Sequence, residues 1–105
     1  MTKQSLLDVL KMDEQKQLQW LCCRAYKSHS LPKYIIPEVL AFSLRDKAVE
    51  KEHIAFDQSL EDIYCLLHPN FEPDNEFQHF VMLWAAKYAT PIEIIIASLI
   101  VLEAK

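Results

Sequence analysis

The sequence contains no glycine, and this absence limits the possible folds of the chain more than any other feature. Glycine supplies the positive φ angles of tight turns and lets the backbone approach a phosphate closely. A chain without it cannot contain a P-loop, a GxGxxG turn or a GxSxG nucleophile elbow. It also lacks the residue on which most β-hairpin turns depend. Good helix formers such as Leu, Ala, Glu, Lys and Gln dominate instead, which predicts a mostly helical protein.

The remaining composition is that of one globular domain. The chain has 105 residues, of which 51% are hydrophobic and 25% charged, so we expect residues 1–105 to form a single helical domain. The three cysteines are odd in number and two are adjacent, which does not indicate a disulfide framework. No signal peptide is recognised, because Asp8 interrupts the first ten residues. We therefore expect a reduced, cytoplasmic protein.

The net charge of −4 is unevenly distributed along the chain. Residues 1–35 hold six Lys or Arg and three Asp or Glu, whereas residues 36–78 hold three and ten. These balances are +3 and −7. An acidic middle third argues against general affinity for nucleic acid, and we interpret it as a solvated acidic face.

Helix-start signals and apolar spacing divide the chain into six short helices. Thr90 is a good cap, followed by Pro91 at the first helical position and Glu93 at the third. Ser59 and Asp62 show a similar capping-box spacing. The predicted helices cover residues 5–12, 13–28, 35–52, 59–69, 75–89 and 90–105.

Two segments leave the secondary structure open. Residues 53–58 are typical of either a short strand or a linker, and residues 77–84 alternate well enough to form a strand. The predicted fold class is all-α, a compact bundle of five to six short helices. The alternative is α+β, with helices on a small antiparallel sheet.

The last predicted helix is apolar around almost its whole circumference. A helix of this kind must be buried on all sides, so it is either the centre of the bundle or part of a subunit interface. We predict the interface, in a homodimer whose contact surface includes Ile94, Ala97 and Val101. A membrane span is not expected, because Lys87, Pro91 and Glu93 interrupt the long apolar run.

Groups that could carry chemistry are present but do not match a known pattern. Cys65 and His68 are three residues apart, and Cys22 and Cys23 lack the C-x-x-C spacing of a redox pair. Four possible metal ligands bracket one loop without a known metal-site spacing: His68, Asp74, Glu76 and His79. We predict no catalytic residue, no cofactor and no metal.

The N-terminal third combines basic and aromatic residues, as surfaces that hold single-stranded nucleic acid do. We expect the basic residues to be scattered around their helix, which makes nucleic-acid binding an alternative function only. The residues concerned are Lys11, Lys16, Trp20, Arg24, Tyr26, Lys27, Lys33 and Tyr34.

Two segments resemble the helices of phage ABA-sandwich proteins. In that family a Tyr-led helix with an Ala–aromatic pair precedes strands, and a Thr-Pro-led helix ends the domain. The Gly-rich and Trp-rich pieces of the family are absent from this chain. The resemblance implies strands at residues 53–58 and 77–84, a phage or prophage origin and no established activity. It covers about a third of the chain and rests on Tyr34, Ala41, Phe42, Thr90, Pro91 and Ile94.

Together these patterns predict a non-enzymatic protein–protein interaction module: a small adaptor, inhibitor or regulator, encoded by a phage or mobile element. The first alternative is a nucleic-acid-associated regulator that uses the basic N-terminal third. The second is a small metal-dependent or cysteine hydrolase. The predicted partners are another protein and a second copy of the chain, with no membrane.

Overall fold

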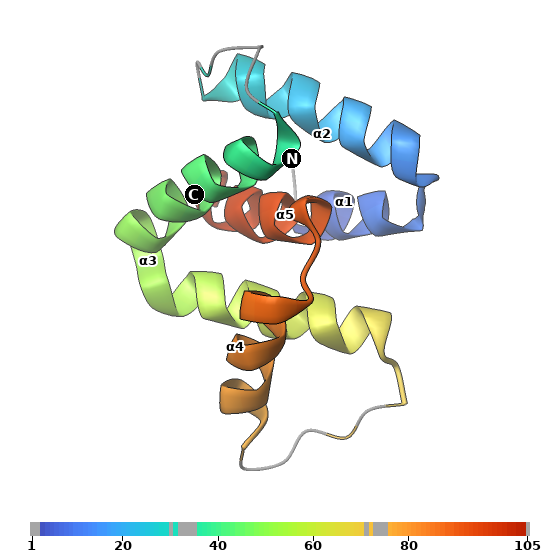
Figure 1. Cartoon of the computed structure of the whole chain (residues 1–105), viewed down its shortest axis with the longest axis vertical. Helices are drawn as coiled ribbons and strands as arrows, with labels where there is room; N and C mark the ends of the chain where they lie inside the picture. Colours follow the sequence, from blue (N-terminus) through green and yellow to red (C-terminus); the bar gives the residue numbers. More distant parts are fainter. Residues whose placement is uncertain (1–2, 30, 32–35, 71, 73–75, 105) are drawn as a thin grey trace.

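The computed structural model describes residues 3–29, 31, 36–70, 72 and 76–104. Within these residues the chain forms five α-helices and one turn of 3-10 helix and contains no strand. The elements are α1 (Lys3–Asp8), η1 (Val9–Lys11), α2 (Glu14–Ser28), α3 (Pro37–Leu67), α4 (Phe77–Lys87) and α5 (Pro91–Leu102) (Figure 1). The prediction of an all-α bundle is confirmed. The α+β alternative is wrong, because residues 53–58 and 77–84 are helical.

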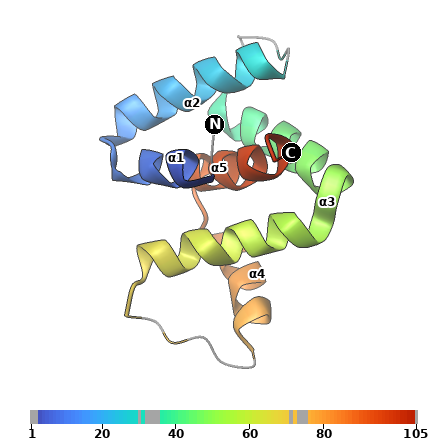
Figure 2. The same cartoon turned by 180° about the vertical axis from the view of Figure 1, so that it is seen from behind.

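Helix α3 is a bent helix with two arms that diverge at Glu52. This residue has φ −161° and ψ 93°, so one extended residue interrupts an otherwise helical segment. We call residues 37–51 the first arm and residues 53–67 the second arm. Figures 1 and 2 show the two arms running in different directions from this bend.

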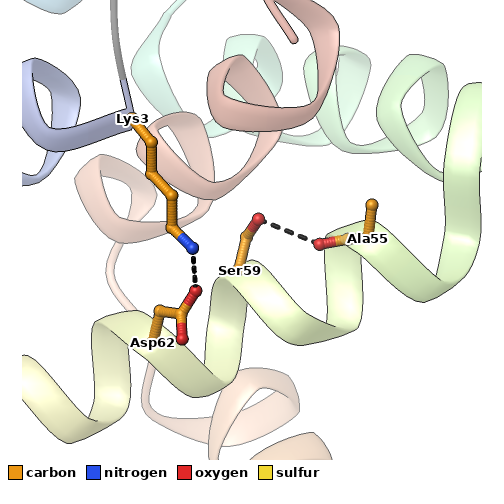
Figure 3. Close-up of polar contacts among 4 residues, drawn as sticks. All are labelled: Lys3, Ala55, Ser59 and Asp62. Carbon is orange, nitrogen blue, oxygen red and sulfur yellow. Dashed lines mark hydrogen bonds and ion pairs between the residues drawn. The ribbon is translucent and has the colours of Figure 1, made fainter.

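Residues 53–58 are helical, so neither the predicted strand nor the predicted linker is present there, and the predicted cap at Ser59 is wrong. Ser59 lies inside the second arm, where its hydroxyl donates a hydrogen bond to the Ala55 carbonyl at 2.9 Å (Figure 3). Asp62 forms an ion pair with Lys3 of α1 instead of completing a capping box. Buried side chains continue at helical spacing through the segment, at Phe56, Ser59, Leu60 and Ile63.

Helix α5 lies at the centre of the molecule, between α2 and the second arm of α3 (Figures 1 and 2). It also contacts α1. Ile95, Ile96 and Leu99 are completely buried. The polar Ser98 is equally buried, and its hydroxyl donates to the Ile94 carbonyl at 2.7 Å, so it needs no partner from another helix. The apolar circumference of α5 is therefore covered by the chain itself.

Both ends of α5 are fixed by specific polar contacts. At the start, the Thr90 hydroxyl accepts a hydrogen bond from the Glu93 N–H at 3.3 Å, and Glu93 accepts one from the Thr90 N–H at 3.0 Å. This is the predicted capping box. At the end, Lys51 Nζ donates to the carbonyls of Val101, Leu102 and Ala104 at 3.0, 3.3 and 3.1 Å.

Helix α4 is attached to the second arm through aromatic rings gathered around Tyr64. The Tyr64 ring lies edge-on to Phe77, Phe80 and Trp84, with centroid distances of 6.1, 5.4 and 5.2 Å. This contact covers only one side of α4. The other side remains exposed, and no helix in the described part of the chain has the length and hydropathy of a membrane-spanning segment.

Candidate interaction surfaces

The three residues predicted to form a subunit interface are buried inside the single chain. Ile94, Ala97 and Val101 expose 8%, 0% and 2% of their surfaces. The physical reason is the bend in α3, which lets one helix cover more than one side of α5. The sequence allows α5 to be either the centre of the bundle or part of a subunit interface, and in the structure it is the central helix. A homodimer stays a prediction. Ala97 is covered by the chain itself, while Ile94 and Val101 expose only small fractions of their surfaces, each beside a surface depression.

An apolar groove lies between the first arm of α3 and α4. We call it the α3–α4 groove. It has a volume of about 150 Å³ and is lined by Glu38, Ala41, Phe42, Arg45, Ala85, Ala86, Ala89, Pro91 and Ile94. Four of these nine residues are alanines, and Glu38 and Arg45 are the two charged residues of the lining. Sequence patterns could not reveal it, because its two sides are about forty residues apart in the chain.

Large apolar side chains are exposed on the two helices that border this groove. Phe42 is 54% exposed, and the Arg45 guanidinium carbon lies 4.8 Å from the centre of its ring. Such a cation–aromatic contact holds the ring in an open position at the rim. Other exposed large apolar side chains of the first arm and α4 are Val39, Val49, Phe80, Met82 and Leu83, and Ile36 and Tyr88 directly flank these helices. Clusters of this kind mark contact surfaces more often than isolated exposed residues do.

A second surface, which we call the α2 basic face, consists of Lys16, Trp20, Arg24 and Lys27. These residues line a shallow depression of about 760 Å³ with Gln19, Cys23 and Ser28. The expectation that the basic residues are scattered around the helix is wrong for Lys16, Arg24 and Lys27. Helical spacing of four, eight and eleven residues from Lys16 was the signal that could have placed them on one side.

The other members of the predicted basic and aromatic set lie elsewhere. Lys11 is in η1 and pairs with Asp8 at 3.6 Å. Tyr26 packs partly against the core. Lys33 and Tyr34 lie outside the described residues. The structure thus brings together only Lys16, Trp20, Arg24 and Lys27.

A third depression, of about 360 Å³, lies at the inner side of the bend in α3. Its cations already have partners: Lys51 holds the end of α5, and Lys3 pairs with Asp62 (Figure 3). The Ser59 hydroxyl is likewise directed to the Ala55 carbonyl. The polar groups at this depression therefore hold the fold together.

The possible metal ligands around residues 68–79 do not form a cluster. Among the described residues no group of three or more His, Cys, Asp or Glu side chains could hold a metal ion. His68 stacks on Tyr64 at 4.2 Å, and its Nδ1 lies 3.1 Å from the Tyr64 carbonyl oxygen. His79 is exposed on α4, and Asp74 lies outside the described residues.

Two of the three cysteines, Cys22 and Cys65, are in environments that disfavour the thiolate. All three are free: Cys23 is exposed, while Cys22 and Cys65 are half-buried. Burial raises the pKa of the Cys65 thiol, and the Asp62 and Glu61 carboxylates raise it further. Burial, followed by the charge of Cys23, also raises the pKa of Cys22. A nucleophilic cysteine requires a lowered pKa, so neither half-buried thiol has the chemistry of one.

No protein-family model, curated protein or solved structure matches this chain. The resemblance to phage ABA-sandwich proteins stays a prediction. The strands that it implies at residues 53–58 and 77–84 are helices in this structure. Of the residues that carry it, Tyr34 lies outside the described part of the chain, while Phe42 and Ile94 line the α3–α4 groove.

Proposed function

We propose that the protein is a non-enzymatic protein–protein interaction module, an adaptor, inhibitor or regulator, whose α3–α4 groove binds a helix of a partner protein. One observation carries this proposal: the groove combines four alanines with the exposed Phe42 ring. Aromatic and arginine side chains, here Phe42 and Arg45, are enriched at protein contact surfaces.

The lining of the groove favours a helix as the occupant. Alanine side chains allow another helix axis to approach closely, because interaxial distance depends on the side chains at the contact. Glu38 and Arg45 place one negative and one positive charge on the same arm. An amphipathic helix with apolar residues at helical spacing and a charge of each sign complements this arrangement.

Photo-crosslinking in the cell of origin tests the proposal. A photoreactive residue in place of Ala86, which lines the groove, should yield a crosslinked partner protein. The additional change Phe42→Glu should abolish this product without changing the circular dichroism spectrum, because Phe42 is exposed. The matched control places the photoreactive residue at the exposed Gln58 on the second arm. The same product from both positions, or its persistence in Phe42→Glu, would overturn the proposal.

The homodimer remains part of this proposal. Because Ala97 and Val101 are almost fully buried, we propose the α3–α4 groove, which Ile94 also lines, as the contact surface for a second copy. A cytoplasmic location and an origin in a phage or mobile element also remain proposals, and the three free cysteines support a reducing compartment.

Nucleic-acid binding is the alternative function, and one observation favours it. Lys16, Arg24 and Lys27 share one side of α2 with Trp20. The charge of the rest of the chain opposes it, because residues 36–78 carry a balance of −7 that repels a polyanion.

A further inference from the structure

The α2 basic face carries two cations that the fold does not use. In the described part of the chain neither Lys16 nor Lys27 forms an ion pair, and both residues are exposed. They are eleven residues apart, which is about 16 Å along a helix axis. Figures 1 and 2 both show α2 at an edge of the molecule, and the exposure of Lys16, Cys23 and Lys27 leaves this side of the helix open to a partner.

The residues between the two lysines continue the same side of the helix. Lys16, Trp20, Cys23 and Lys27 follow one another at spacings of four, three and four residues. Alternating three- and four-residue spacing is the pattern with which one helix packs along another. The opposite side of α2, with Gln17, Leu21 and Ala25, already packs into the core. Helix α2 therefore presents two helix-packing sides, of which one is free.

Arg24 holds the centre of this surface in place. Its guanidinium makes two contacts with the Glu103 carboxylate, Nη2 to Oε1 at 2.7 Å and Nε to Oε2 at 3.3 Å. The same group lies 5.9 Å from the centre of the Trp20 ring. A two-point contact restricts the guanidinium plane, and the guanidinium in turn restricts Trp20. Trp20 is thus half-buried and positioned before any partner binds.

We infer that the α2 basic face is a second binding surface, which takes an acidic amphipathic helix of a partner protein. The positive charges of this surface are complementary to an acidic helix, and the spacing of its residues is that with which two helices pack. Carboxylates eleven residues apart on the partner would face the unpaired ammonium groups of Lys16 and Lys27. Apolar residues between them would cover Trp20 and Cys23.

A nucleic acid fits this surface less well. Tight binding to a phosphate backbone uses many cations, and here Arg24 is already neutralised by Glu103, which leaves two. The chain as a whole carries −4, which repels a long polyanion and repels a short peptide of two or three charges much less.

The test uses a designed peptide as the probe. The peptide is a fluorescein-labelled helix of about 18 residues, with Glu at two positions eleven residues apart and Leu at the two positions between them that follow the same pattern. A second peptide has Gln in place of both Glu residues. Fluorescence anisotropy measures binding of each peptide to the full chain.

We expect saturable binding of the Glu peptide and at least about tenfold weaker binding of the Gln peptide, a difference of about 1.4 kcal/mol. Lys16→Glu with Lys27→Glu should weaken binding of the Glu peptide about tenfold or more, and so should Trp20→Ala. The matched control, Lys47→Glu with Lys87→Glu, makes the same change in net charge at exposed lysines outside this surface and should change affinity less than about twofold.

Three results would overturn the inference. The first is equal binding of the two peptides, or no saturable binding below about 1 mM. The second is an equal loss in the Lys16/Lys27 and Lys47/Lys87 variants. The third is tighter binding of a single-stranded oligonucleotide, or of vesicles with anionic lipid, with affinity falling steeply between about 50 and 200 mM salt. The change Phe42→Glu leaves α2 intact, so failure of the groove proposal and failure of this one give different results.

Discussion

At the scale of single residues, Lys51 joins the bend of α3 to the end of α5. It directly precedes Glu52, and its ammonium group donates hydrogen bonds to three carbonyls at the end of α5. The last carbonyls of a helix lack partners within the helix and carry the negative end of its dipole. One cation therefore satisfies these carbonyls and fixes the direction in which α3 continues.

Replacing this ammonium group should lower stability without unfolding the protein. Lys51→Met keeps most of the aliphatic stem and removes the charge, so we expect the free energy of unfolding to fall by about 1–2 kcal/mol. Urea denaturation followed by circular dichroism measures the change. Lys47→Met, at an exposed lysine one helical turn earlier, is the control and should lie within about 0.5 kcal/mol of the original protein. Equal effects of the two changes would show that Lys51 does not hold α5.

Residue patterns predicted some local features correctly and others wrongly. The Thr90–Glu93 capping box is confirmed, because all of its determinants lie within four residues. The similar spacing at Ser59 and Asp62 led to a wrong prediction of a helix start, because the buried side chains of the second arm extend the helix to residues before Ser59. Their packing against distant residues outweighs the local capping preference.

At the scale of elements, the position of α5 follows from its composition only in part. An apolar circumference predicts burial on all sides, and this is confirmed. The helices that cover α5 could not be predicted, because one extended residue at Glu52 decides whether α3 continues straight or bends. No glycine or proline marks that position in the sequence.

The central place of α5 predicts the effect of charges inside it. Ile94→Glu with Val101→Glu should unfold the protein, because two carboxylates would be buried without partners, at a cost of more than about 4 kcal/mol. Circular dichroism should show loss of the helical signal. The control, Met82→Glu with Leu83→Glu at exposed positions of α4, should remain folded. A folded monomer of the Ile94/Val101 variant would instead place α5 at a subunit interface.

At the scale of the whole molecule, the two proposed binding surfaces differ in chemistry. The α3–α4 groove is apolar, and the α2 basic face is positively charged. The absence of glycine correctly predicted the fold class, because this prediction needs only the composition and not the contacts between distant residues. The groove was beyond sequence analysis, because it exists only where α4 and the first arm meet. The α2 basic face could have been predicted, because the helical spacing of its residues is visible in the sequence.

The mass of the particle in solution tests the homodimer and its location together. Light scattering coupled to size exclusion should give twice the 12.3 kDa chain mass for the original protein. Phe42→Glu with Leu83→Glu should give 12.3 kDa, because Phe42 lines the groove proposed for the contact and Leu83 is exposed on α4, one of the two helices that border it. A monomer for both proteins would show that the homodimer prediction is wrong. A dimer for both would show that the dimer contact lies on another surface.

The burial of α5 has a consequence for the order in which this protein is made. Synthesis proceeds from the N-terminus, so α1 to α4 leave the ribosome before α5. The sides of α3 that later cover α5 have nothing to pack against during that interval, because most of the fully buried isoleucines belong to α5. We therefore expect the earlier helices to lack a complete apolar core until residues 91–102 are available, which would make folding a late and cooperative event.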